Sequence, residues 1–130
     1  KPTTKQISEW VKAPMAYRIE YLDGLKSTML LMNGLVGDFT FAASLKDQAE
    51  PLSTLFYLPP NPNVSYSAAL MSNAEEMFIT GKAPYPVERT LLTSGILAAC
   101  LGSLGNGQKR IETPHLKVSY QPGKSTFWRE

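Results

Sequence analysis

The chain has 130 residues, the size of one domain, and is long enough to bury a core without disulfides or a structural metal. Thirteen basic and eleven acidic residues leave a net charge of +2 with no basic stripe, which argues against nucleic acid as a partner. The single cysteine excludes an internal disulfide and a multi-cysteine zinc site. It suits a reducing compartment, so we expect a cytoplasmic protein.

The first residues are polar and bounded by prolines, and the chain starts with KPTTKQ rather than with an initiator methionine or an apolar leader. We therefore expect residues 1–15 to form a lead-in segment with one helical turn near Trp10. Residues 16–130 are expected to form a single domain. We also expect the chain to be a piece of a longer protein.

Three β-rich runs follow one another between residues 16 and 45, and the pairs Asp23-Gly24 and Asn33-Gly34 separate them. Both pairs tolerate the positive φ that tight turns need. The pattern therefore predicts a three-stranded antiparallel meander.

Further strand signals follow the meander. A fourth strand is expected over residues 54–58, where two prolines end it. Residues 109–120 are expected to add a short edge strand that is interrupted at Pro114. The sequence thus predicts an antiparallel or mixed, open-faced β-sheet of four to five strands.

Two helices are predicted to cover one face of this sheet, which gives an α+β fold. The first spans residues 67–79, where Leu70, Ala74 and Met77 recur at helical spacing, and Gly81 is a suitable C-terminal cap. The second spans residues 87–104. Its charge-free run is shorter than the ~18 apolar residues of a membrane span, so we expect a buried helix and no membrane association.

Few residues are candidates for catalysis or metal binding. Cys100 lies among leucines and alanines, where a thiol usually packs as a small hydrophobic group. His115 is the only histidine, so a metal site would need carboxylates from elsewhere in the chain. We therefore assign no catalytic, cofactor-binding or metal-binding residue.

A proline-bounded loop is the candidate for binding a substrate or a partner. It carries Lys82, Tyr85, Glu88 and Arg89, which combine charge, a phenol and a backbone set by prolines, and we add His115 to this candidate set. Helix capping and a surface ion pair are the competing explanation for the same residues.

The order of motifs resembles the C-terminal domain of the Gfo/Idh/MocA oxidoreductases. The likeness is sharpest over YSAALMSNAEEMFITGKAPYPVERTLLTSGILAACLGSLGNGQKRIETPHL, with a helix that ends at Thr80-Gly81-Lys82, a proline loop, a long helix and a glycine turn. YRIEYLDGLKSTMLLMNG and DFTFAASL are similar to uncharacterised members of that family.

This resemblance implies that a separate N-terminal Rossmann domain binds NAD(P) in the full-length parent and that the present chain is inactive alone. The C-terminal domain would shape the pocket for a small-molecule substrate and mediate oligomers. The family often carries an Asp-x-x-x-His pair here, and this sequence has none. Two alternatives therefore stay open: an interaction module of a parent that has lost catalysis, and a small independent enzyme using Cys100 or His115.

The predicted sheet is expected to need a partner. Met29 and Leu31 alternate with Leu30 and Met32 along one strand, so both of its faces carry large apolar groups. Two helices can cover only one face of such a sheet. We therefore predict a homodimer that packs face to face across the open sheet.

The first testable prediction concerns the cofactor. The sequence contains no glycine-rich phosphate-binding motif between a strand and a helix, so the chain alone should not bind a nicotinamide cofactor. Isothermal titration of the purified chain with NAD and with NADP should give no binding heat. Micromolar affinity for either dinucleotide would contradict this expectation.

Overall fold

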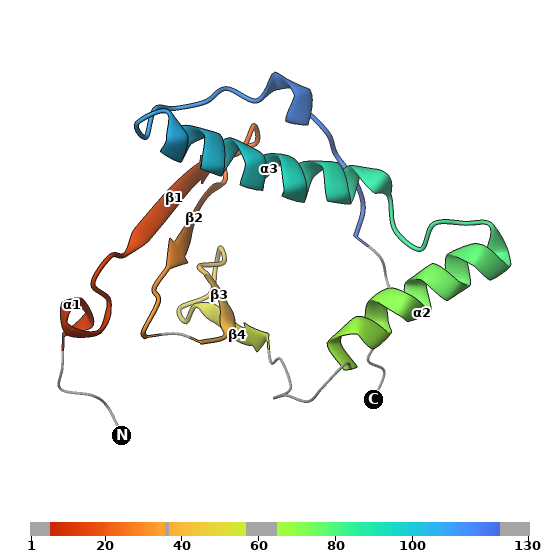
Figure 1. Cartoon of the computed structure of the whole chain (residues 1–130), viewed down its shortest axis with the longest axis horizontal. Helices are drawn as coiled ribbons and strands as arrows, with labels where there is room; N and C mark the ends of the chain where they lie inside the picture. The colour runs from red at the N-terminus through yellow and green to blue at the C-terminus, as the bar shows by residue number, and fades with distance from the viewer. Residues whose placement is uncertain (1–5, 36, 57–64, 123–130) are drawn as a thin grey trace. The chain divides into compact units, whose positions relative to one another are not determined.

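A computed structural model of the chain describes residues 6–35, 37–56 and 65–122 (Figure 1). The fold is α+β, as predicted. Its elements are α1 (Ile7–Trp10), β1 (Met15–Glu20), β2 (Lys26–Leu31), β3 (Phe39–Ala43), β4 (Leu52–Phe56), α2 (Ser65–Thr80), α3 (Val87–Gly105) and a 3-10 turn, η1 (Pro114–Leu116). They belong to two compact units, residues 1–61 and 62–130.

β1 and β2 form an antiparallel hairpin, as Asp23-Gly24 predicted. Gly24 has a φ of 91°, and its amide donates to the carbonyl of Tyr21 at 3.1 Å. The Asp23 carboxylate closes the turn by accepting a hydrogen bond from the amide of Leu25 at 3.0 Å. Directly paired residues share a face, and one face of the hairpin is mostly apolar, with Met15, Tyr17, Ile19, Met29 and Leu31.

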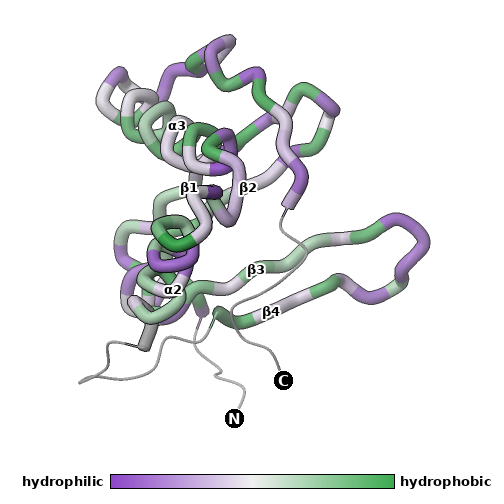
Figure 2. Tube along the Cα trace, turned by 90° about the vertical axis from the view of Figure 1, so that its right-hand side faces the viewer, coloured by the Kyte–Doolittle hydropathy of each residue, from purple (hydrophilic) through white to green (hydrophobic). Residues whose placement is uncertain are grey.

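β3 and β4 form a second antiparallel hairpin, in which Phe39 lies opposite Phe56 and Phe41 lies opposite Thr54. One face of this hairpin therefore carries three phenylalanines, and we call it the aromatic face: Phe39, Phe41, Ala43, Leu52, Thr54 and Phe56. Figure 2 shows the hydrophilic loop, in purple, that joins the two strands. The phenylalanines are 48 to 66 % exposed.

The strands form two sheets of two strands each, where the sequence predicted one sheet of four to five strands. Asn33-Gly34 does make a turn, with a φ of 95° at Gly34, but no hairpin follows because β3 begins only at Phe39. A Cβ atom at Gly34 would lie 2.8 Å from the carbonyl oxygen of Trp10, so the turn contacts the lead-in segment. β4 starts at Leu52, earlier than predicted, and its predicted end at residues 57–58 lies outside the described residues.

Both long helices form close to their predicted bounds. α2 ends at Gly81, whose φ is 67° and whose amide donates to the carbonyl of Met77 at 2.9 Å. α3 follows Pro86, which is its N-cap, and carries Glu88 in its first turn. Its 19 residues are long and apolar enough to cross a membrane by length and composition, which is weak evidence because core helices of soluble proteins pass the same test.

The chain turns back after α3 and runs along that helix, and we call residues 109–118 the returning segment (Figure 1). The edge strand predicted here is wrong, because residues 106–122 contain only the turn η1. Pro114 cannot donate a backbone hydrogen bond to a sheet, and the segment is held by α3 instead. The hydroxyl of Ser103 donates to the carbonyl of Lys109 at 2.7 Å.

Two glycines of α3 face the returning segment. A Cβ atom at Gly95 would overlap Cδ2 of Leu116, and one at Gly102 would lie 3.3 Å from Cδ1 of Ile111. Gly95 therefore permits a contact between side chain and helix backbone that alanine would block.

Three apolar side chains are buried among the described residues: Val11, Cys100 and Leu116. The expected burial of Cys100 is thus confirmed. The expectation of a largely buried helix is wrong, because Leu97 and Leu101 of α3 are 51 % and 55 % exposed. Within the second unit, the returning segment covers a single stripe of α3.

The second prediction tests the contact between Gly95 and Leu116. Gly95→Ala should lower the free energy of unfolding by up to ~2 kcal/mol, because overpacking costs ~1–3 kcal/mol and the ~1 kcal/mol that alanine adds in a helix offsets only part of that cost. Gly105→Ala is the matched control, since a Cβ atom there meets nothing within 4 Å and the change should be neutral or stabilising.

Urea denaturation and hydrogen exchange of residues 109–118 provide the two measurements. In Gly95→Ala, amide exchange in the returning segment should accelerate while α3 stays helical. Unchanged exchange in that segment would show that Leu116 does not depend on the glycine.

Candidate functional site

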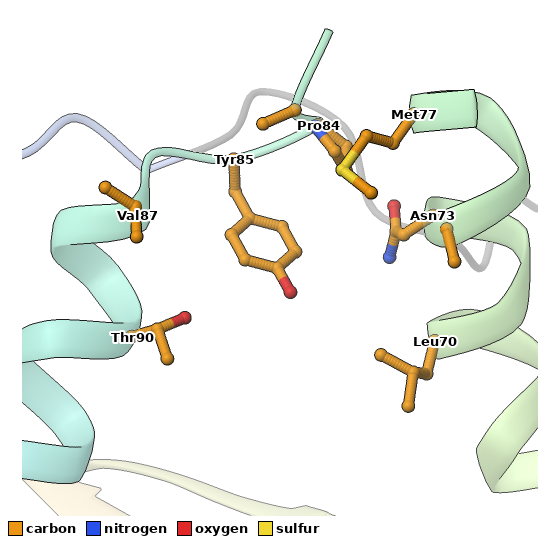
Figure 3. A pocket seen from close by; sticks show the side chains of 9 residues that line it. Leu70, Asn73, Met77, Pro84, Tyr85, Val87 and Thr90 are labelled. Carbon is orange, nitrogen blue, oxygen red and sulfur yellow. The ribbon is translucent and has the colours of Figure 1, made fainter. Parts of the chain in front are cut away.

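An open hollow lies between α2, the proline loop of residues 81–86 and the first turn of α3 (Figure 3). Its volume is about 330 Å³. It is lined by Leu70, Asn73, Ala74 and Met77 from α2, by Ala83, Pro84 and Tyr85 from the loop, and by Val87 and Thr90 from α3. All of these residues belong to the second unit.

Tyr85 is the loop residue that reaches furthest into this hollow (Figure 3). Prolines precede and follow it, so the backbone on both sides has little freedom. The guanidinium carbon of Arg89 lies 4.6 Å from the centre of the phenol ring, within the range of a cation–π contact. The flanking prolines thus restrict the backbone of Tyr85, and the Arg89 guanidinium packs against one face of its ring.

The structure brings together two of the five residues that the sequence singled out, Tyr85 and Arg89. Lys82 is exposed, and its backbone amide donates to the hydroxyl of Thr80 at 3.2 Å. Glu88 lies in the first turn of α3, near the positive end of the helix dipole, as the helix-capping explanation expects. Within the described residues, no ion pair joins Glu88 to Arg89. His115 lies in the turn η1 and is not among the described residues that line the hollow at Tyr85.

The residues proposed for an independent enzyme lie in different surroundings. Cys100 is buried on α3, while His115 is exposed in the turn η1. No hydrogen bond joins the two among the described residues. In the same part of the chain, no group of three histidine, cysteine, aspartate or glutamate side chains is arranged to hold a metal ion.

Sequence reasoning missed two polar residues of the hollow, Asn73 and Thr90. Asn73 is not part of the apolar pattern that predicted the helix, yet it lies one turn from both Leu70 and Met77, at the i+3 and i+4 spacing that puts side chains on one face. Thr90 lies three residues after Val87 and shares its face of α3. This helical spacing was the signal available in the sequence.

Comparison of the chain with known protein families, with curated proteins and with solved structures gives no match. The resemblance described above therefore stays a hypothesis that rests on the residues of this chain.

The third prediction tests the position of the Tyr85 ring. Ring current should shift the side-chain protons of Arg89 upfield in the NMR spectrum, because the guanidinium lies over the ring face. Tyr85→Leu should abolish the shift and cost about 0.5–1 kcal/mol of stability, the value of an exposed cation–π pair. Tyr85→Phe keeps the ring and is the control. A shift that survives Tyr85→Leu would place Arg89 elsewhere.

Proposed function

We propose that the chain is a non-catalytic module that binds a small-molecule substrate and joins two copies of itself, as the C-terminal domain of a Gfo/Idh/MocA-like oxidoreductase would. The exposed aromatic face of the β3–β4 hairpin is the observation that carries this proposal. The hollow at Tyr85 supports the substrate-binding half, because ligand sites are typically concave and mostly apolar with few polar groups.

The aromatic face is the proposed centre of the dimer. Phe39 and Phe56 lie opposite each other across the hairpin and are 66 % and 55 % exposed. Contiguous apolar surface of this kind is unusual on a monomer and marks association sites. A two-fold axis through the face would stack these rings against the same rings of a second copy.

The other hairpin offers a second apolar face, with Tyr17, Met29 and Leu31 on one side. In the proposed dimer, the apolar faces of the two hairpins supply the association surface that was predicted from the sequence. The proposal assigns the redox chemistry and NAD(P) to a Rossmann domain of a longer parent, while this chain contributes the substrate hollow.

The alternative, an interaction module of a parent without catalysis, draws on one observation. The sequence contains no Asp-x-x-x-His pair, which the family often places in this domain. Both proposals include the dimer, and they differ in whether the full-length parent binds NAD(P). Titration of that parent with NAD(P) separates them, because heat of binding favours the oxidoreductase.

The fourth prediction is that light scattering after gel filtration gives a dimeric mass at tens of micromolar protein. Phe39→Thr combined with Phe56→Thr should give a monomer, because it removes two large apolar groups from the aromatic face and keeps strand propensity.

Leu55→Thr is the matched control, because Leu55 is 53 % exposed on the opposite face of the same hairpin. It should leave the dimer intact. A monomeric wild-type chain would reject the dimer, and an equal loss of dimer in the control would move the interface off the aromatic face.

A further inference from the structure

Among the residues that the structure describes, no charged side chain lines the hollow between α2 and α3, although Lys82, Glu88 and Arg89 are its neighbours in sequence. The first turn of α3 explains this separation. Val87 and Thr90 are three residues apart and share one helix face, so the two charged residues between them project from other faces. Any ligand in the hollow therefore meets apolar groups and neutral polar groups.

Three neutral polar groups are available to such a ligand. In the part of the chain that the structure describes, the hydroxyl groups of Tyr85 and Thr90 donate no hydrogen bond. Figure 3 shows both hydroxyl groups directed into the hollow, with Asn73 across from them on α2. The Asn73 amide nitrogen donates to the carbonyl of Ala69 at 2.9 Å, which fixes the amide and leaves its oxygen as an acceptor.

We propose that the hollow binds a compact, uncharged molecule with a largely apolar body and one hydrogen-bonding head group, such as a hydroxyl or a primary amide. The proposal rests on the proposed function, because it names the ligand class of the same site. A charged group placed there would lose hydration without an opposite charge among the lining side chains, since Arg89 lies against the Tyr85 ring and outside the lining. The two hydroxyls and the amide oxygen, in contrast, satisfy a neutral head group.

The volume sets the size of the ligand. A hollow of about 330 Å³ is at the lower end of the range for small-molecule sites, so a ligand with a single ring fits this class. Leu70, Ala74 and Met77 of α2 form one apolar wall for that ring. Val87 of α3 lies opposite, and Pro84 lies beside Met77 at the loop end (Figure 3).

The fifth prediction uses four probes of nearly equal shape: benzyl alcohol, benzamide, benzoate and benzylammonium. In NMR titrations of the whole chain, the two neutral probes should bind about tenfold more tightly than the two ions. Their shift changes should centre on Tyr85, Asn73 and Thr90. Equal or tighter binding of benzoate or benzylammonium would overturn the proposal.

Two alanines of α2 provide matched variants. Ala74→Phe fills the hollow and should abolish binding of the neutral probes, while Ala68→Phe adds the same group at an exposed position outside the lining and should leave it unchanged. Binding that survives Ala74→Phe, or no binding of any probe, would overturn the proposal.

The same samples separate this inference from the proposed function. Light scattering on each variant reports the dimer independently of the probes. Binding of benzoate that is lost in Ala74→Phe would leave a substrate site in place and reject only its neutral character. A monomeric chain that still binds benzyl alcohol would reject the dimer and leave the ligand class standing.

Discussion

The contact of Leu116 with Gly95 gives the second unit its tertiary structure. α3 presents a glycine where the Leu116 side chain approaches the helix backbone, and Cys100 is buried on the same helix. The earlier part of the returning segment also contacts α3: Ile111 packs near Gly102, and the carbonyl of Lys109 accepts a hydrogen bond from the hydroxyl of Ser103. The glycines of α3 therefore determine where the chain runs after the last turn of that helix. The turn η1 forms where Leu116 approaches the backbone of α3 most closely.

The apolar faces that remain exposed fit the proposed module. Each hairpin separates apolar from more polar residues between its two faces, and its strand pairing satisfies the backbone groups between the two strands. The aromatic face stays exposed, whereas Met15, Tyr17 and Ile19 on the apolar face of β1–β2 are half-buried. Two-stranded hairpins are at best marginally stable in water, which makes association a route to stability as well as to assembly. The hollow, in contrast, is built from α2, α3 and a proline loop and uses none of these strands.

Local sequence signals predicted the elements better than the way they pair. The turn at Gly24, the cap at Gly81 and the N-terminal position of Glu88 depend on neighbouring residues alone, and the structure confirms all three. The single sheet and the edge strand near Pro114 depend on which partner a segment selects. Near Pro114, the contact between Leu116 and Gly95 of α3 holds the segment that was predicted to be an edge strand, and no local sequence pattern indicates such a contact. Likewise, the proline loop indicated Tyr85 as a candidate site residue. Asn73 was missed because it is polar, although its helical spacing from Leu70 and Met77 places it on the face that lines the hollow.

The arrangement of the packed elements has a kinetic consequence. β1 pairs with β2, β3 pairs with β4, and α3 packs with η1, so each pair consists of neighbours along the chain. Ordering such pairs closes only short loops, and chains rich in local contacts fold rapidly. Each hairpin, and α3 with its returning segment, can therefore begin to order within a single chain, before the association that the proposed dimer requires. Encounter between copies would then be the slow, concentration-dependent step of the whole process.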